Sequence, residues 1–196
     1  MAIAPQHWLS LARVALGAII WRSLSIGERS SWVFPLVLIA CLLDFADGRV
    51  ARAYGSDGPI GRTIDNGCDF VFLALCFHAF ARMELWSDPT TSVAVKLWRG
   101  GNGLPLLALA LSFGSYAWRA AVCAARGLPL TPSPVGRAAG VLNYALALVG
   151  GVAVSPHWHR QRTLLEVSMA FVVAANLAAF LQNSILLARQ LRRRAS

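Results

Sequence analysis

The chain has 196 residues, of which 57% are hydrophobic and only 14% charged, and its formal net charge is +9. Soluble domains usually carry about 25% charged residues, so this composition excludes an ordinary soluble domain and indicates a polytopic membrane protein. The positive charge would also suit a nucleic-acid-binding protein. Arginines at the ends of membrane helices account for the same excess, so we expect no nucleic-acid partner. The four cysteines include no C-x-x-C pair, which argues against a disulfide framework or a zinc site.

Six apolar segments follow one another along the chain, each long enough for a tilted helix to cross a bilayer, which takes about 17–25 residues. They lie at 7–24, 32–54, 61–83, 103–126, 134–154 and 162–188. Glycine and proline are concentrated in the connections, as in GSDGPIG, RGGNGLP and RGLPLTPSPVG. The sequence therefore predicts an all-α fold, a single membrane domain over residues 1–196 with six transmembrane helices.

Charge sets the expected orientation of these helices. An even number of spans places both termini on one side of the membrane, and the arginine-rich C-terminal tail favours the cytoplasm by the positive-inside rule. The connection between the second and third segments is then cytoplasmic too, with Arg49, Arg52 and Arg62 around it. The outer connections also carry basic residues, so the bias is moderate. We expect an integral protein of the bacterial inner (cytoplasmic) membrane with both termini in the cytoplasm.

The acidic residues are gathered in one place, since five of the nine lie in the 26 positions from Asp44 to Asp69. The apolar run before them, 32–43, has 12 residues. It would make only about 18 Å of helix, too short for a hydrocarbon core of about 30 Å. The second helix must therefore continue through Asp44 and Asp47. The third must begin near Gly61, because its apolar part starts only after Asp69. Acids that end one helix and open the next then meet at the cytoplasmic end of both.

Helical periodicity places the acidic and small residues of each helix on one stripe. The two stripes are Asp44, Asp47, Gly48 and Ala51, and Gly61, Asp65 and Asp69. Four carboxylates are thus expected to converge, beside small residues that let a ligand approach the backbone. Like charges this close need compensating cations, and an all-oxygen cluster suits Mg²⁺ or Mn²⁺ held jointly by carboxylates and substrate phosphates. The alternative is a solvated rim paired with nearby arginines, but two matched acidic pairs favour the metal site.

The same pattern indicates a family. Asp44-x-x-Asp47-Gly48-x-x-Ala51-Arg52, eight residues, Gly61-x-x-x-Asp65-x-x-x-Asp69 resembles the complete signature of the CDP-alcohol phosphotransferases, also called CDP-alcohol phosphatidyltransferases. The resemblance implies six membrane helices, usually in a homodimer, and it covers the whole chain. Asn66 and Phe70 depart from the residues that commonly follow the third and fourth acids in the family, which blurs the identity of the acceptor.

The resemblance also implies roles at the matching positions. Asp44, Asp47 and Asp65 would bind two divalent ions, Mg²⁺ or Mn²⁺, that hold the CDP diphosphate. Asp69 would be the catalytic general base and a further metal ligand. The nucleotide site would be lined by Gly48, Ala51, Arg52 and Gly61. The implied reaction transfers a phosphatidyl group from a CDP-linked lipid such as CDP-diacylglycerol to an acceptor alcohol and releases CMP, largely through positioning and metal stabilisation of charge.

Four arginines are candidates for binding a phosphate or the acceptor. His7-x-x-Ser10-x-x-Arg13 resembles the N-x-x-T-x-x-R opening of the family's first helix, so Arg13 either reaches a phosphate or snorkels to the interface. The other three, Arg119, Arg126 and Arg137, would form an anion pocket for a phosphorylated acceptor, although a cytoplasmic charge bias alone would also place them there. This cluster and the chain length favour glycerol 3-phosphate as the acceptor, with inositol phosphate, serine or another alcohol as alternatives.

Three other functions stay as alternatives. A membrane prenyltransferase also holds a diphosphate with aspartates and Mg²⁺, but we would expect more helices than 196 residues supply. A transporter or other ion-binding membrane protein can hold buried acids, but it would not need the glycine, alanine and arginine positions of the pattern. An inactive scaffold would not need all four aspartates. Metal-dependent release of CMP would separate the enzyme from all three.

Overall fold

The structure is a computed structural model, and it describes residues 5–26, 31–53, 59–82, 103–155 and 162–192. The described residues form helices and no strand, which confirms the predicted all-α fold. The six helices are α1 (Pro5–Ser25), α2 (Val33–Ala53), α3 (Pro59–Arg82), α5 (Leu104–Ala125), α6 (Pro134–Ala153) and α7 (Arg162–Arg192). Each of them overlaps one of the six predicted segments.

Four helical segments of the described chain are long and apolar enough to cross a membrane. They are Thr63–Arg82, Leu104–Ala125, Pro134–Ala153 and Val167–Arg192. The two remaining helices, α1 and α2, have 21 residues each, which is also a sufficient length. Neither is among these four segments, so their crossing of the membrane stays a prediction.

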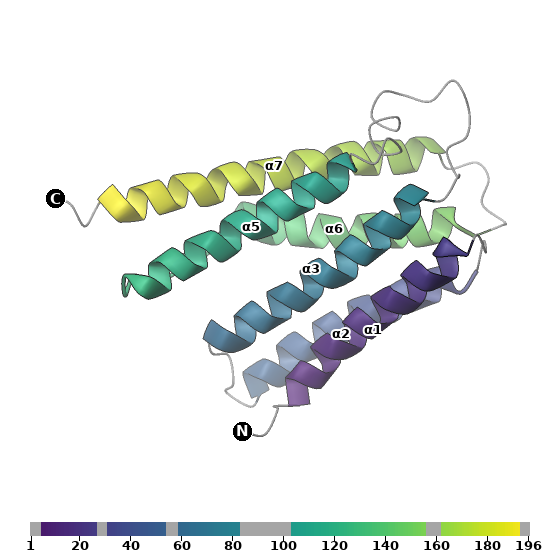
Figure 1. The fold of residues 1–196 in the computed structure, drawn as a ribbon, viewed down its shortest axis with the longest axis horizontal. Helices are drawn as coiled ribbons and strands as arrows, with labels where there is room; N and C mark the ends of the chain where they lie inside the picture. The colour runs from purple at the N-terminus through teal and green to yellow at the C-terminus, as the bar shows by residue number, and fades with distance from the viewer. Residues whose placement is uncertain (1–4, 27–30, 54–58, 83–102, 156–161, 193–196) are drawn as a thin grey trace.

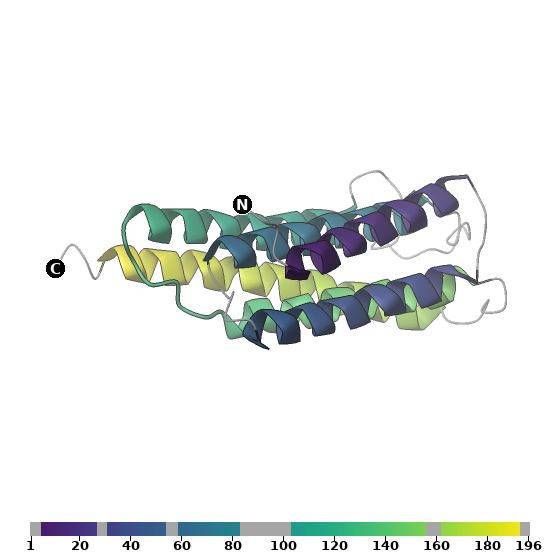
Figure 2. The ribbon, with the colours of Figure 1, turned by 90° about the horizontal axis from the view of Figure 1, so that it is seen from below.

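Helices that follow one another along the chain run in opposite directions, in a bundle in which α1 packs on α2 and α3, α6 on α2 and α7, and α5 on α3 and α7 (Figure 1). The start of α1, the end of α2, the start of α3, the α5–α6 connection and the end of α7 lie at the same end of the bundle (Figure 1). Figure 2 shows α1, α3 and α5 on one side and α2 and α6 on the other. The apolar core includes Ile20, Val37, Phe77 and Leu146.

Local signals set the connection between α5 and α6. Gly127 has a φ of 62°, a left-handed conformation that glycine adopts without strain, and it ends α5. The N–H of Leu128 then donates to the carbonyl of Cys123 at 2.8 Å, as in a Schellman motif. Ser133 caps α6, because its Oγ accepts a hydrogen bond of 3.0 Å from the N–H of Gly136. The chain therefore turns back sharply at this end of the bundle.

Small residues allow close approach between the helices that carry the site. An ideal Cβ added to Gly17 of α1 would lie 3.1 Å from Cδ2 of Phe72 and 3.3 Å from its Cα. One added to Gly151 of α6 would lie 3.1 Å from Cα of Phe34 in α2. Membrane helices commonly pack through such small residues. Gly17 lies one turn after Arg13, so this contact brings the middle of α1 against α3.

Candidate active site

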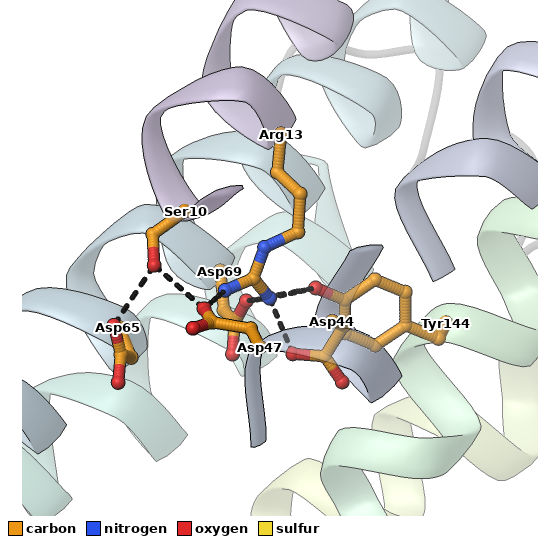
Figure 3. A network of polar contacts seen from close by, with 7 residues as sticks. All are labelled: Ser10, Arg13, Asp44, Asp47, Asp65, Asp69 and Tyr144. Carbon is orange, nitrogen blue, oxygen red and sulfur yellow. Dashed lines mark hydrogen bonds and ion pairs between the residues drawn. The ribbon is translucent and has the colours of Figure 1, made fainter. Parts of the chain in front are cut away.

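The four aspartates of the predicted pattern are all on helices, as the length argument requires. Asp44 and Asp47 lie in the second half of α2, and Asp65 and Asp69 lie in the first half of α3. Because α2 and α3 are antiparallel (Figure 1), the acids come together near one end of the bundle. Figure 3 shows their side chains gathered around residues of α1 and α6.

Arg13 lies at the centre of these acids. Its side chain is buried, with 1% of its surface exposed, and extends from α1 between the carboxylates (Figure 3). Nη2 donates to Oδ2 of Asp47 at 2.9 Å, and Nη1 forms ion pairs with Asp44 and Asp69. A snorkelling arginine would expose its guanidinium, whereas that of Arg13 is buried among carboxylates. Contact of Arg13 with the carboxylates themselves was not among the sequence predictions.

Ser10 lies one turn before Arg13 on the same face of α1. Its Oγ is 2.7 Å from Oδ2 of Asp47 and 2.8 Å from Oδ1 of Asp65. A hydroxyl has one proton to donate, so this hydroxyl donates to one of these carboxylates at a time. The three-residue spacing of the two α1 side chains therefore lets them contact all four aspartates together.

The donor set of this cluster is suited to a divalent cation. The acids offer only oxygen atoms, the ligands that Mg²⁺ and Mn²⁺ prefer, and the single charge of Arg13 faces three carboxylates. Oδ1 of Asp47 is buried without a hydrogen-bond partner among the described residues, and a cation would satisfy it. Among the described residues, no three or more Asp, Glu, His or Cys side chains are arranged so that they could bind one metal ion together. Arg13 lies between the carboxylates instead (Figure 3).

Tyr144 also belongs to the cluster, although the sequence analysis did not identify it. Its hydroxyl on α6 lies 2.8 Å from Oδ1 of Asp69 and 3.2 Å from Nη1 of Arg13. Its ring stacks on Phe72 with the ring centroids 5.8 Å apart. The signal in the sequence is a pair of polar residues, Asn143 and Tyr144, in an otherwise apolar stretch of helix. Nothing local indicates which neighbouring helix either of them faces.

The positions predicted to line the nucleotide site flank the acids along the chain. Gly48, Ala51 and Arg52 lie in the last turns of α2, and Gly61 lies in the first turn of α3. The side chains at these positions are outside the described part of the structure. Their backbone lies at the same end of the bundle as the carboxylates (Figure 1).

The three arginines predicted to form an anion pocket lie on both sides of the α5–α6 turn. Arg119 is fully buried, and its Nη2 donates to the carbonyl of Thr131 at 2.7 Å. Nε and Nη1 of Arg119 are buried without a hydrogen-bond partner among the described residues. Arg126 and Arg137 are exposed. Of the three, Arg119 therefore has buried donors that an anion would satisfy.

A cavity of about 780 Å³ lies between α3 and α5. Its α3 wall includes Asn66 and Phe70, and its α5 wall consists mainly of alanine and other small or aromatic residues. Asn66 directly follows Asp65, and Phe70 directly follows Asp69. The two positions that depart from the common family residues thus line a mostly apolar cavity beside the acid-bearing face of α3.

Comparison with known proteins gives one match. A family model described as CDP-alcohol phosphatidyltransferase matches residues 4–189, which is nearly the whole chain and includes every residue drawn in Figure 3. No curated protein and no solved structure matches the chain. The match confirms the resemblance that the spacing of the aspartates, glycines and arginine indicates.

Proposed function

We propose a reaction for this enzyme on the premise that the chain belongs to the CDP-alcohol phosphatidyltransferase family, whose enzymes transfer a phosphatidyl group from a CDP-alcohol. The proposed donor is CDP-diacylglycerol or a similar lipid, and the proposed acceptor is glycerol 3-phosphate. CMP is released. The observation that carries the proposal is the convergence of four aspartates from two antiparallel helices on Ser10 and Arg13. Like charges gathered this closely repel one another, so packing alone would not favour this arrangement.

We assign metal binding to Asp44, Asp47 and Asp65, with Asp69 as a further ligand. When bound, Mg²⁺ or Mn²⁺ ions, two in number by the family resemblance, would hold the donor diphosphate and neutralise charge on its oxygens. The buried oxygen of Asp47 without a partner and the excess of carboxylates over guanidinium support this assignment. Since Arg13 contacts Asp44 and Asp47, a divalent ion bound to these two carboxylates would compete with Arg13 for them.

We assign the general base to Asp69. Its side chain is 19% exposed, whereas that of Asp47 is 4% exposed, so a substrate hydroxyl has better access to Asp69. Asp69 takes the proton from the acceptor hydroxyl while the acceptor oxygen forms a bond to the lipid-side phosphorus. The bond from this phosphorus to the CMP oxygen breaks, and CMP leaves with its electron pair. The residues predicted for the nucleotide site, Gly48, Ala51, Arg52 and Gly61, would position the cytidine side of the donor.

The acceptor proposal rests on the arginines at the α5–α6 turn. The two buried nitrogen atoms of Arg119 without partners among the described residues would donate to a phosphate, and the exposed Arg126 and Arg137 would add positive charge on both sides of the α5–α6 turn. Arg137→Ala should then raise the KM for glycerol 3-phosphate and leave the affinity for the CDP-lipid nearly unchanged, because uniform binding appears in KM. Steady-state kinetics on purified protein measure both. An unchanged acceptor KM would leave inositol phosphate, serine or another alcohol equally open.

We place the enzyme in the bacterial inner membrane as a homodimer, with the site facing the cytoplasm. Four apolar segments of sufficient length support a membrane location. The start of α1 and the end of α7 lie at the same end of the bundle, as expected for an even number of spans (Figure 1). Reporter fusions after Arg194 and within residues 53–60 should both report the cytoplasm, and a fusion near residue 90 should report the opposite side. The reverse pattern would contradict the orientation.

The reaction itself is tested with purified protein, CDP-diacylglycerol and a panel of labelled alcohols. We expect CMP release that requires Mg²⁺ or Mn²⁺, together with a lipid product labelled from glycerol 3-phosphate. A labelled product from another alcohol alone would correct the acceptor. No CMP release with any alcohol, or equal release after removal of divalent ions, would contradict the proposed reaction.

A further inference from the structure

Helix α6 places the hydroxyl of Tyr144 in the cluster of four aspartates, Ser10 and Arg13 drawn in Figure 3. It lies 2.8 Å from Oδ1 of Asp69 and 3.2 Å from Nη1 of Arg13. A guanidinium can only donate hydrogen bonds, so the phenol oxygen accepts from Arg13. The phenol proton is then left for Asp69. The chemistry of the two partners therefore determines the direction of both hydrogen bonds.

Both donors to Asp69 bind the same carboxylate oxygen. Oδ1 receives the Tyr144 hydroxyl and Nη1 of Arg13, while Oδ2 receives no hydrogen bond from the described residues. Two donors on one oxygen fix the rotation of the carboxyl group, since turning it would break both bonds to a charged acceptor. The second oxygen keeps its lone pairs for an incoming group.

We propose that Tyr144 is a positioning residue for the reaction: together with Arg13 it holds Oδ1 of Asp69, so that Oδ2 faces the acceptor hydroxyl and takes its proton. The inference rests on the proposed function of Asp69 as the general base. Tyr144 touches neither the reacting phosphorus nor the acceptor in this role. It acts through Asp69, by keeping the base in the orientation that a transfer requires.

The packing of Tyr144 and its hydrogen bond can be separated by mutation. The ring stacks on the buried Phe72, with an interplanar angle of 20°, and this contact does not involve the hydroxyl. Tyr144→Phe keeps the ring and removes only the hydroxyl, which donates to Asp69 and accepts from Arg13. Tyr116 on α5 is also partly buried and is not part of the cluster, so Tyr116→Phe is a matched control for loss of a phenol hydroxyl.

The first test compares these two variants with the wild-type enzyme in kinetics and in binding. Tyr144→Phe should lower kcat about tenfold or more, as expected for loss of a hydrogen bond to a charged group, and leave the KM for both substrates within about twofold. Mn²⁺ affinity, measured by electron paramagnetic resonance, should not change. Tyr116→Phe should keep kcat within about twofold of the wild type. A normal kcat in Tyr144→Phe, or weaker Mn²⁺ binding that accounts for its loss, would overturn the inference.

The second test asks whether Tyr144 acts through Asp69. In the Asp69→Asn background, adding Tyr144→Phe should lower the residual kcat no further, because the carboxylate that the hydroxyl holds is already absent. A loss that multiplies with that of Asp69→Asn would show that Tyr144 acts elsewhere. Absence of CMP release from the wild-type enzyme would instead contradict the proposed function itself, whereas an active wild type with an unaffected Tyr144→Phe contradicts the positioning role alone.

Discussion

Two of the groups of buried polar side chains in the described part of this bundle differ in how completely they are paired. Asn143 and Asn176 join α6 to α7 through reciprocal hydrogen bonds of 3.2 and 2.7 Å, and Nδ2 of Asn176 also donates to the carbonyl of Val172. Both amides are neutral and fully buried. The acids of the candidate site are charged, outnumber the guanidinium that contacts them, and include an oxygen of Asp47 without a partner in the described structure.

The contrast is sharpest at two consecutive residues of α6. Asn143 pairs with α7, while Tyr144 donates to Asp69 on α3. A neutral pair that satisfies itself joins two helices and leaves nothing for a ligand to bind. A charged group with an unsatisfied oxygen keeps a binding position open, and its burial is unfavourable until a ligand arrives. Between these two groups, completeness of pairing, rather than polarity, therefore separates the structural contact from the candidate site.

Loss of one metal-site carboxylate should have the largest effect. In Asp44→Asn, Asp47→Asn or Asp65→Asn we expect CMP release to fall to background and Mn²⁺ binding to weaken, because a neutral amide replaces an anionic ligand. CMP release and Mn²⁺ titration measure the two effects. Asp57→Asn, at an acid outside the pattern, is the matched control and should stay active. Near-normal turnover of any of the three at saturating Mn²⁺ would contradict the assignment.

Loss of the proposed base should lower the rate without loss of binding. Asp69→Asn should reduce kcat by about 10²–10⁴-fold, the contribution typical of a general base, while CDP and Mn²⁺ titrations change little. The loss should be greater if Asp69 also holds an ion. If Asp69→Asn no longer binds CDP, Asp69 is a metal ligand first and the site has a different base.

Removal of Arg13 should make the charged cluster depend on metal for its stability. Without its guanidinium, the buried carboxylate of Asp47 and the partly exposed ones of Asp44 and Asp69 lose their counter-charge. Arg13→Gln should therefore lower the free energy of unfolding of the metal-free protein by up to about 3–5 kcal/mol, the cost of breaking a buried ion pair. Mn²⁺ should then raise the midpoint of thermal unfolding more in Arg13→Gln than in the wild type, since a ligand that binds only the folded state stabilises it. Thermal unfolding in detergent, with and without Mn²⁺, measures this difference. Equal Mn²⁺ shifts in both proteins would argue against competition between the ion and Arg13.

Loss of the neutral pair of Asn143 and Asn176 should have the smallest effect, and it should lower stability without lowering activity. Asn176→Ala leaves the amide of Asn143 unpaired and should lower the free energy of unfolding by about 1 kcal/mol, as for other side-chain hydrogen bonds between membrane helices. The kcat for CMP release should stay within about twofold of the wild type. A large loss of kcat in a protein of normal stability would show that the two polar regions are not independent.

The sequence determined the helices and the chemistry of the acids on its own. Apolar runs too short to cross a bilayer required α2 to continue through Asp44 and Asp47 and α3 to begin before Asp65. In the structure, α2 does continue past Asp47 and α3 does begin before Asp65. The repeat of the α-helix placed these carboxylates on stripes, and their spacing matched the family pattern. These inferences need only local periodicity and the thickness of the membrane, both of which act within a single segment.

The partners of those acids were decided by the tertiary structure. Arg13 could equally have reached a phosphate or the interface, and Tyr144 lies 75 positions beyond Asp69. Periodicity says which residues of a helix share a face, but it does not say which other helix that face meets. Close packing at Gly17 and Gly151 brings α1 against α3 and α6 against α2, and only then do a guanidinium and a phenol reach the same carboxylate oxygen. Contacts between distant segments depend on how the whole bundle packs, because each pair of side chains meets only where two helices already lie together.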